Sequence, residues 1–209
     1  MKILSLRDKT GNMVKPWIEN GHECHIVDLQ HKGLSVGEGM VKIQADVCAV
    51  AELDYTGYDL IFAFPPCTHL AVSGARWFKE KGLDALVEAI KVFSACIKIC
   101  EQNGAPYMIE NPVSTISSYW RKPDFIFDPC EYGAYLNPPG DEYTKKTCLW
   151  TGNGFIMPEK RPVCPVLGSK IHLMPPTDDR ADLRSETPLG FAYAVYEFNK
   201  IQSSQVACI

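Results

Sequence analysis

The first half of the chain contains short apolar runs separated by polar turns. Five of these runs are expected strands, at residues 2–6, 24–29, 41–45, 58–64 and 107–109. A continuous apolar run such as YDLIFAF at 58–64 is typical of a strand that a parallel sheet buries on both faces. The pattern therefore predicts a mostly parallel sheet.

Helical periodicity appears between and after these runs. Apolar residues at 83, 86, 87, 90, 93, 97 and 100 follow the helical repeat and predict a helix over 83–100. A helix over 13–20 has Pro16 in its first turn, where proline is tolerated, and Gly21 beyond its end. A last helix is predicted over 188–201. The alternation of strands and helices predicts an α/β, doubly wound fold with right-handed crossovers.

The composition of the chain changes after about residue 114. Residues 121–180 are rich in proline, glycine and aromatic residues, with short candidate strands at 125–127 and 147–150. This stretch shows no pattern of a second core. We therefore expect one domain over 1–209, with 121–180 as a small, irregular, loop-rich insertion toward its C-terminal end.

The composition narrows the class of protein. The 209 residues suffice for one sizeable core, and 46% hydrophobic with 22% charged residues is ordinary for a soluble protein. No apolar run approaches a membrane span, and the first residues, MKILSL, lack the features of a secretory signal, so we expect a cytoplasmic protein. The odd count of nine cysteines indicates thiols rather than full pairing. The net charge of −4 argues against an indiscriminate nucleic-acid binder.

Polar residues follow four of the predicted strands. They are RDKTGN at 7–12, Asp28, PPCTH at 65–69 and ENP at 110–112. Ligands of an open parallel sheet bind beyond the carboxyl ends of its strands. One polar residue at a strand end is often only a cap or a turn residue, but four on one sheet indicate a site.

Each strand end suggests a chemical role. A turn containing Gly11 can bring backbone N–H groups close to a ligand, and Asp28 suits a ribose diol. Asp46, one strand further, suits an adenine edge. Cys67 follows two prolines and is expected near helix N-terminal N–H groups, which would lower its pKa and make it a nucleophile. Glu110 can exchange a proton beside it. The alternative roles for Cys67 are a buried thiol and a metal ligand.

The order of these motifs resembles the cytosine-5 DNA methyltransferases, most closely the short single-domain forms of phage and prophage genomes. The resemblance rests on six segments, which are LSLRDKTGN, VDL, FPPCTHLAVSG, IENP, KKTCLW and LRSETPLGFAYAVYEF. It implies a Rossmann-like methyltransferase fold that uses S-adenosylmethionine, in a bacterial or phage-infected host cytosol.

The resemblance also implies a set of site residues. The residues expected to hold the cofactor are Arg7, Asp8, Thr10, Gly11, Asn12, Asp28, Leu29, Asp46 and Pro65. The residues expected at the reaction are Cys67, Pro66, Glu110, Asn111 and Lys146, with Lys145 as the alternative to Lys146. Cys67 would add to C6 of a cytosine flipped out of DNA, and Glu110 would stabilise the charge that develops on the ring.

The chain departs from the family pattern at two places. Arg7, Lys9 and Gly11 stand where the family has an aromatic residue and two glycines. Only residues 151–180 occupy the interval of a target-recognition region. Four alternatives therefore stay open: minimal sequence recognition by this chain, a separate specificity subunit, a free cytidine nucleotide as substrate, or a catalytically weak module that binds DNA or cofactor.

A zinc site in the C-terminal half is the remaining candidate. Its ligands would be Cys130, Cys148, Cys164 and His172. These residues contain no Cys-x-x-Cys pair, which is the usual spacing of a structural zinc site. We therefore expect no metal.

Overall fold

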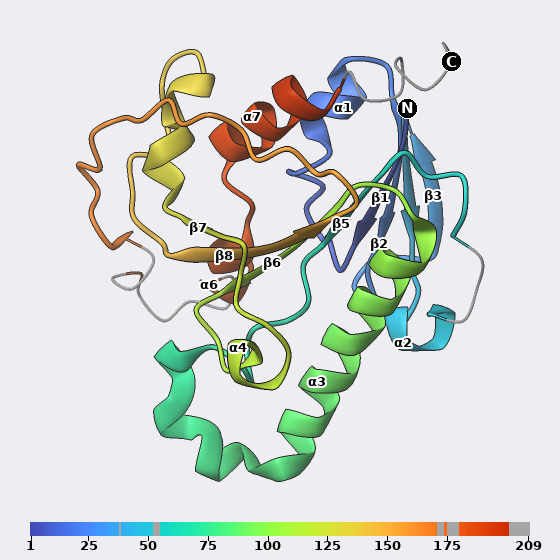
Figure 1. Cartoon of the computed structure of the whole chain (residues 1–209), viewed down its shortest axis with the longest axis vertical. Helices are drawn as coiled ribbons and strands as arrows, with labels where there is room; N and C mark the ends of the chain where they lie inside the picture. Colours follow the sequence, from blue (N-terminus) through green and yellow to red (C-terminus); the bar gives the residue numbers. More distant parts are fainter. Residues whose placement is uncertain (38, 52–54, 171–173, 175–179, 201–209) are drawn as a thin grey trace.

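The computed structural model describes residues 1–37, 39–51, 55–170, 174 and 180–200. Among these residues, eight strands form one sheet in the order β3-β4-β2-β1-β5-β6-β8-β7 (Figure 1). The strands are β1 (Lys2–Leu6), β2 (Glu23–Val27), β3 (Leu34–Gly37), β4 (Met40–Ile43), β5 (Leu60–Ala63), β6 (Tyr107–Pro112), β7 (Phe125–Phe127) and β8 (Thr147–Gly152).

The centre of the sheet is parallel and its edges are antiparallel. β1 pairs in parallel with β2 and β5, β2 with β4, and β5 with β6. β3 pairs antiparallel with β4 on one side, while β8 and β7 extend the other side antiparallel. The predicted mostly parallel α/β sheet is therefore confirmed. Leu6 lies opposite both Val27 and Ala63, so β1, β2 and β5 end at the same level.

Helices cover both faces of this sheet. Their bounds are α1 (Lys15–Glu19), α2 (Val47–Val50), α3 (Phe78–Asn103), α4 (Ile116–Tyr119), α6 (Arg180–Ser185) and α7 (Leu189–Asn199), with short helical segments η1 (Val72–Trp77) and η2 (Pro129–Tyr135). Side chains alternate between the two faces of a strand, so Ile61 packs in the core with α3, whereas Phe62 packs in the core with α1 and α7 (Figure 1). None of the described helices is long and apolar enough to cross a membrane.

The predicted helices are correct in position and differ at their ends. The predicted helix over 83–100 lies within α3, which begins earlier and bends at Gly82, where φ is 77°. The predicted helix over 13–20 shortens to α1. β2 ends at Val27, so Asp28 and Leu29 lie just beyond the strand rather than within it.

The stretch 121–180 contributes to the same sheet and the same core. β8 runs along β6 over six residue pairs, and β7 pairs with β8. The ring of Phe191 in α7 lies 4.2 Å from that of Phe127 in β7 and 5.1 Å from that of Tyr132 in η2. The aromatic residues of this stretch therefore fill space between the sheet edge and α7.

Candidate active site

The segment after β5 is bonded to the last residues of β6, which include Glu110 and Asn111 and so extend the predicted strand at 107–109. The side-chain amide of Asn111 donates a buried hydrogen bond of 2.8 Å to the carbonyl oxygen of Pro65. Further along, Val72 donates its N–H to the carbonyl of Val113 at 3.0 Å, and Thr115 donates to the carbonyl of Leu70 at 3.0 Å. The PPCTH and ENP segments, more than forty residues apart in sequence, are therefore neighbours.

Cys67 lies at the start of a tight turn and is half-buried. The amides of Leu70 and Ala71 donate to its carbonyl oxygen at 3.0 and 2.9 Å. Burial raises the pKa of the Cys67 thiol, and the nearby Glu110 carboxylate raises it further, while Lys145 and Arg184 oppose the change. The predicted lowering of this pKa is wrong, because burial of the thiol outweighs the groups that lower its pKa.

Glu110 stands on β6 with one carboxylate oxygen shielded from water. That atom, Oε1, has no hydrogen-bond partner in the described part of the chain. Burial raises the pKa of the Glu110 carboxyl, and the charge of Lys145 opposes this effect. A carboxyl with a raised pKa and an unsatisfied oxygen is a common feature of functional sites.

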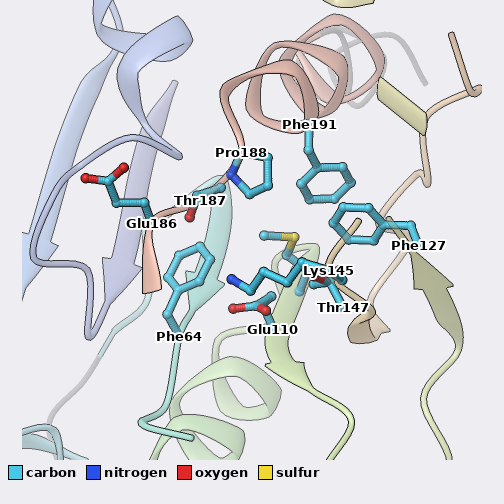
Figure 2. Close-up of a pocket in the computed structure, with 10 residues that line it drawn as sticks. Phe64, Glu110, Phe127, Lys145, Thr147, Glu186, Thr187, Pro188 and Phe191 are labelled. Atoms are coloured by element: carbon cyan, nitrogen blue, oxygen red, sulfur yellow. Dashed lines mark hydrogen bonds between the residues drawn. The ribbon is translucent and has the colours of Figure 1, made fainter. Parts of the chain in front are cut away.

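Glu110 lines a narrow pocket between the sheet and the start of α7. Its walls are formed by Phe64, Met108, Glu110, Phe127, Lys145, Thr147, Glu186, Thr187, Pro188 and Phe191. Figure 2 shows the amine of Lys145 beside the carboxylate of Glu110, whereas the carboxylate of Glu186 points away from the centre. The cavity volume of this pocket is about 10 Å³, which is room for about one water molecule. A ligand as large as an aromatic ring could enter only if the walls separate.

The structure distinguishes between the two candidate lysines. Lys145 lines the pocket, and its charge acts on both Glu110 and Cys67. Lys146 is exposed, and its charge acts on Cys148 of β8 instead. The structure thus brings Lys145, and not the expected Lys146, to the side of Glu110.

The loop after β1 is organised by Asp8, which is buried. One of its oxygens accepts the N–H of Gly11 at 2.7 Å and the hydroxyl of Thr10 at 3.4 Å, and the other accepts the hydroxyl of Ser5 at 2.8 Å. Burial raises the pKa of the Asp8 carboxyl, while these hydrogen bonds lower it. Asn12 donates its N–H to the hydroxyl of Thr10 at 3.2 Å. Asp8 and Thr10 therefore shape the turn.

Arg7 and Asp28 lie side by side at the ends of β1 and β2. Arg7 has a left-handed backbone, with φ at 58°, and its N–H donates to the carbonyl of Val27 at 2.7 Å. Its Nη1 lies 3.7 Å from Oδ2 of Asp28. The other oxygen of Asp28 accepts the N–H of Gln30 at 2.8 Å, and Leu29 between them is 49% exposed. Arg7 and Asp28, which were both predicted to hold the cofactor, are therefore neighbours although they come from different loops.

Asp46 has a structural role in the described chain. It is the N-cap of α2, and its carboxylate accepts the N–H of Cys48 at 2.9 Å. The side chain is exposed at the same edge of the sheet. Capping explains why an acid stands here, and its contact with an adenine stays a prediction.

Several pocket residues carried no recognisable signal in the sequence. Phe127 comes from an edge strand, and Phe191 and Pro188 come from the predicted last helix, where they read as core positions. Only the convergence of β6, β7, β8 and α7 places them around Glu110. Thr187 belongs to the closing segment named above, but its position in the pocket could not be inferred from that segment alone.

The four candidate zinc ligands are spread over different elements. Cys148 is buried in β8, Cys130 is buried in η2, and Cys164 is exposed, while His172 falls outside the described residues. Over the described ranges, no group of three or more histidine, cysteine, aspartate or glutamate side chains is arranged to hold a metal ion.

The chain was compared with models of known protein families and with curated proteins. No family model matches it, and no curated protein matches it significantly. The geometry of the loops after β1, β2, β5 and β6 is therefore the basis for a functional conclusion.

Proposed function

We propose that this protein transfers a methyl group from S-adenosylmethionine to C5 of cytosine in DNA, through a covalent bond between Cys67 and C6 of the base. The observation that carries the proposal is the hydrogen bond that joins the Cys67 loop, through Pro65, to Asn111 beside Glu110 on β6. It supports a nucleophile and a carboxyl acting on one ligand, because the charge of Glu110 reaches the thiol.

Cys67, Glu110 and Lys145 each have a separate role in the proposed reaction. The Cys67 thiol gives its proton to water, and its sulfur bonds to C6 while the electron pair of the C5–C6 double bond moves to C5, where it bonds the methyl group. The raised pKa of Glu110 favours its protonated form, in which it would donate a hydrogen bond to N3 of the ring. Lys145 offsets negative charge at both groups. The C5 proton then passes to water, the electron pair of the C5–H bond re-forms the double bond, and the sulfur leaves C6 as the thiolate.

The cofactor is assigned to the loops after β1 and β2. S-adenosylmethionine supplies an electrophilic methyl group when it is bound. Asp28 would accept hydrogen bonds from the ribose hydroxyl groups of the cofactor, and the turn at Gly11 would lie against the cofactor. The fit is supported by a buried guanidinium nitrogen of Arg7 that has no hydrogen-bond partner among the described residues. A Rossmann-like methyltransferase fold is part of the same proposal, and the central parallel order β4-β2-β1-β5-β6 is compatible with it.

Covalent trapping tests the proposal. The protein is incubated with S-adenosylmethionine and DNA containing 5-fluoro-2′-deoxycytidine, because fluorine at C5 prevents release of Cys67. We expect an adduct that survives denaturation and maps to Cys67 by mass spectrometry. The adduct should persist in Cys164→Ser, which removes an exposed thiol, and disappear in Cys67→Ser.

Two other outcomes would contradict the proposal. An adduct formed with 5-fluoro-dCMP and not with DNA would indicate a free nucleotide as the substrate. DNA or cofactor binding without any adduct, and without methyl transfer to unmodified DNA, would indicate a binding module.

A further inference from the structure

The guanidinium of Arg7 has unused hydrogen-bonding capacity in a shielded position. Its side chain is 14% exposed, and Nε is buried without a hydrogen-bond partner in the described chain. Its ion-pair contact with Asp28 is 3.7 Å long, which exceeds hydrogen-bond distance. A guanidinium carries five N–H donors, and leaving a buried one unpaired costs free energy. Such a group indicates a missing acceptor.

The backbone holds Arg7 in this position. Its left-handed conformation, with φ at 58°, and its N–H bond to Val27 direct the residue toward β2. Asp28 is fixed in turn, because its own N–H donates to the carbonyl of Ile43 at 3.1 Å. The charge of Arg7 reaches the buried Cys96 of α3, so the guanidinium lies on the α3 side of the sheet edge. The two side chains are thus pre-positioned before a ligand binds.

The order of the strands indicates which part of the cofactor meets Arg7. Glu110 lies on β6 and Cys67 follows β5, both on one side of β1, and Asp28 follows β2 on the other side. A cofactor that presents its methyl group to Cys67 and Glu110 must place its nucleoside toward β2. Arg7 extends toward β2, so the adenine is the part within its reach.

We propose that Arg7 recognises the adenine ring of S-adenosylmethionine by donating its unpaired Nε–H, in the plane of the ring, to a ring nitrogen. The inference rests on the proposed function. A lysine cannot replace this residue, because its ammonium group does not offer a donor at the position of Nε. Asp28, beside it, accepts the ribose hydroxyls.

The test compares ligands that differ in the adenine. The dissociation constant of S-adenosylhomocysteine is measured by calorimetry. Those of two other ligands are measured by competition against it. Methylthioadenosine keeps the adenine, and S-ribosylhomocysteine lacks it. The variants are Arg7→Lys and Arg7→Gln, and the control is Lys15→Gln, an exposed cation of α1. The melting temperature of each variant reports its folding.

The proposal predicts a loss that depends on the adenine. Both Arg7 variants should bind S-adenosylhomocysteine and methylthioadenosine about tenfold more weakly, the loss of about one charge-assisted hydrogen bond. Binding of S-ribosylhomocysteine should change less than twofold, and Lys15→Gln should match the unchanged protein for all three ligands.

Other results would overturn it in distinguishable ways. Tighter binding by the Arg7 variants would mean that Arg7 blocks the site, and equal weakening for all three ligands would mean that it acts on the ribose or amino acid part. Unchanged binding in the Arg7 variants would refute the inference alone. A chain that binds none of the three ligands would refute both the inference and the proposed cofactor.

Discussion

The hydrogen bond from Asn111 to Pro65 is the most direct link between the two loops of the candidate site. Asn111 is 0% exposed, and its Nδ2 donates to the carbonyl of Pro65 at 2.8 Å across 46 residues of sequence. Its other amide atom, Oδ1, has no hydrogen-bond partner within the described residues. We expect Asn111→Ala to destabilise the protein and to loosen the loop that carries Cys67.

The magnitude follows from the groups left behind. Without Asn111, the buried carbonyl of Pro65 loses its donor, which costs about 1–3 kcal/mol. The substitution also removes the unpaired Oδ1, which returns part of that cost, so the net destabilisation should be about 2 kcal/mol or less. For a chain of this length, 1 kcal/mol corresponds to about 2–4 °C in melting temperature. The expected decrease is therefore about 4–8 °C at most.

A matched control is available in the same chain. Asn20 donates the same kind of bond, from Nδ2 to the carbonyl of Pro16, at the same 2.8 Å, but its side chain is exposed. Water can replace this bond, so Asn20→Ala should stay within about 0.5 kcal/mol of the unchanged protein. Thermal and urea unfolding measure both variants. Equal losses of stability in the two variants, or no loss in Asn111→Ala, would show that burial does not determine what such a hydrogen bond contributes.

Three further predictions concern α7 and the thiol of Cys67. A Cβ at Gly190 would lie 2.5 Å from a backbone oxygen of η2, so Gly190→Ala should destabilise the protein by about 1–3 kcal/mol in urea unfolding. In the control Gly37→Ala, the added Cβ meets no atom within 4 Å and should cause no such loss. Similar losses of stability in both variants would contradict the packing of α7. Because the pKa of Cys67 is raised, its alkylation by iodoacetamide, followed by mass spectrometry, should accelerate about tenfold per pH unit between pH 7 and 8.5. At pH 8, Glu110→Gln should accelerate this alkylation, because the Glu110 carboxylate raises the pKa of Cys67. Lys145→Gln should slow it, because the Lys145 ammonium lowers that pKa. The reverse order of rates would show that these charges do not act on the thiol as described.

The buried parts of the fold could be predicted from the sequence. β1 and β5 are covered on both faces, so their apolar runs stand out, and β1 coincides with the predicted residues 2–6. β3 was not predicted, because all four of its residues are exposed at the sheet edge and carry no burial pattern. α2 was also missed, since a single helical turn capped by Asp46 is too short for periodicity.

The candidate site was predictable only as far as strand topology determines it. Parallel strands end at one edge, which is why Cys67, Glu110 and Asn111 could be expected together. The choice between Lys145 and Lys146 could not be made, because the two residues are adjacent and of the same type, and only the folded chain shows that Lys145 lines the pocket while Lys146 is exposed. The direction of the Cys67 pKa shift also depends on burial, which cannot be read from residue order.

Methyl transfer itself tests the central claim most directly. The protein is incubated with S-adenosylmethionine carrying a labelled methyl group and with unmethylated DNA, and the digested nucleosides are analysed by mass spectrometry. The account predicts labelled 5-methyl-2′-deoxycytidine from the unchanged protein and none from Cys67→Ala. Label at another position of the base, or equal label at C5 with Cys67→Ala, would contradict it.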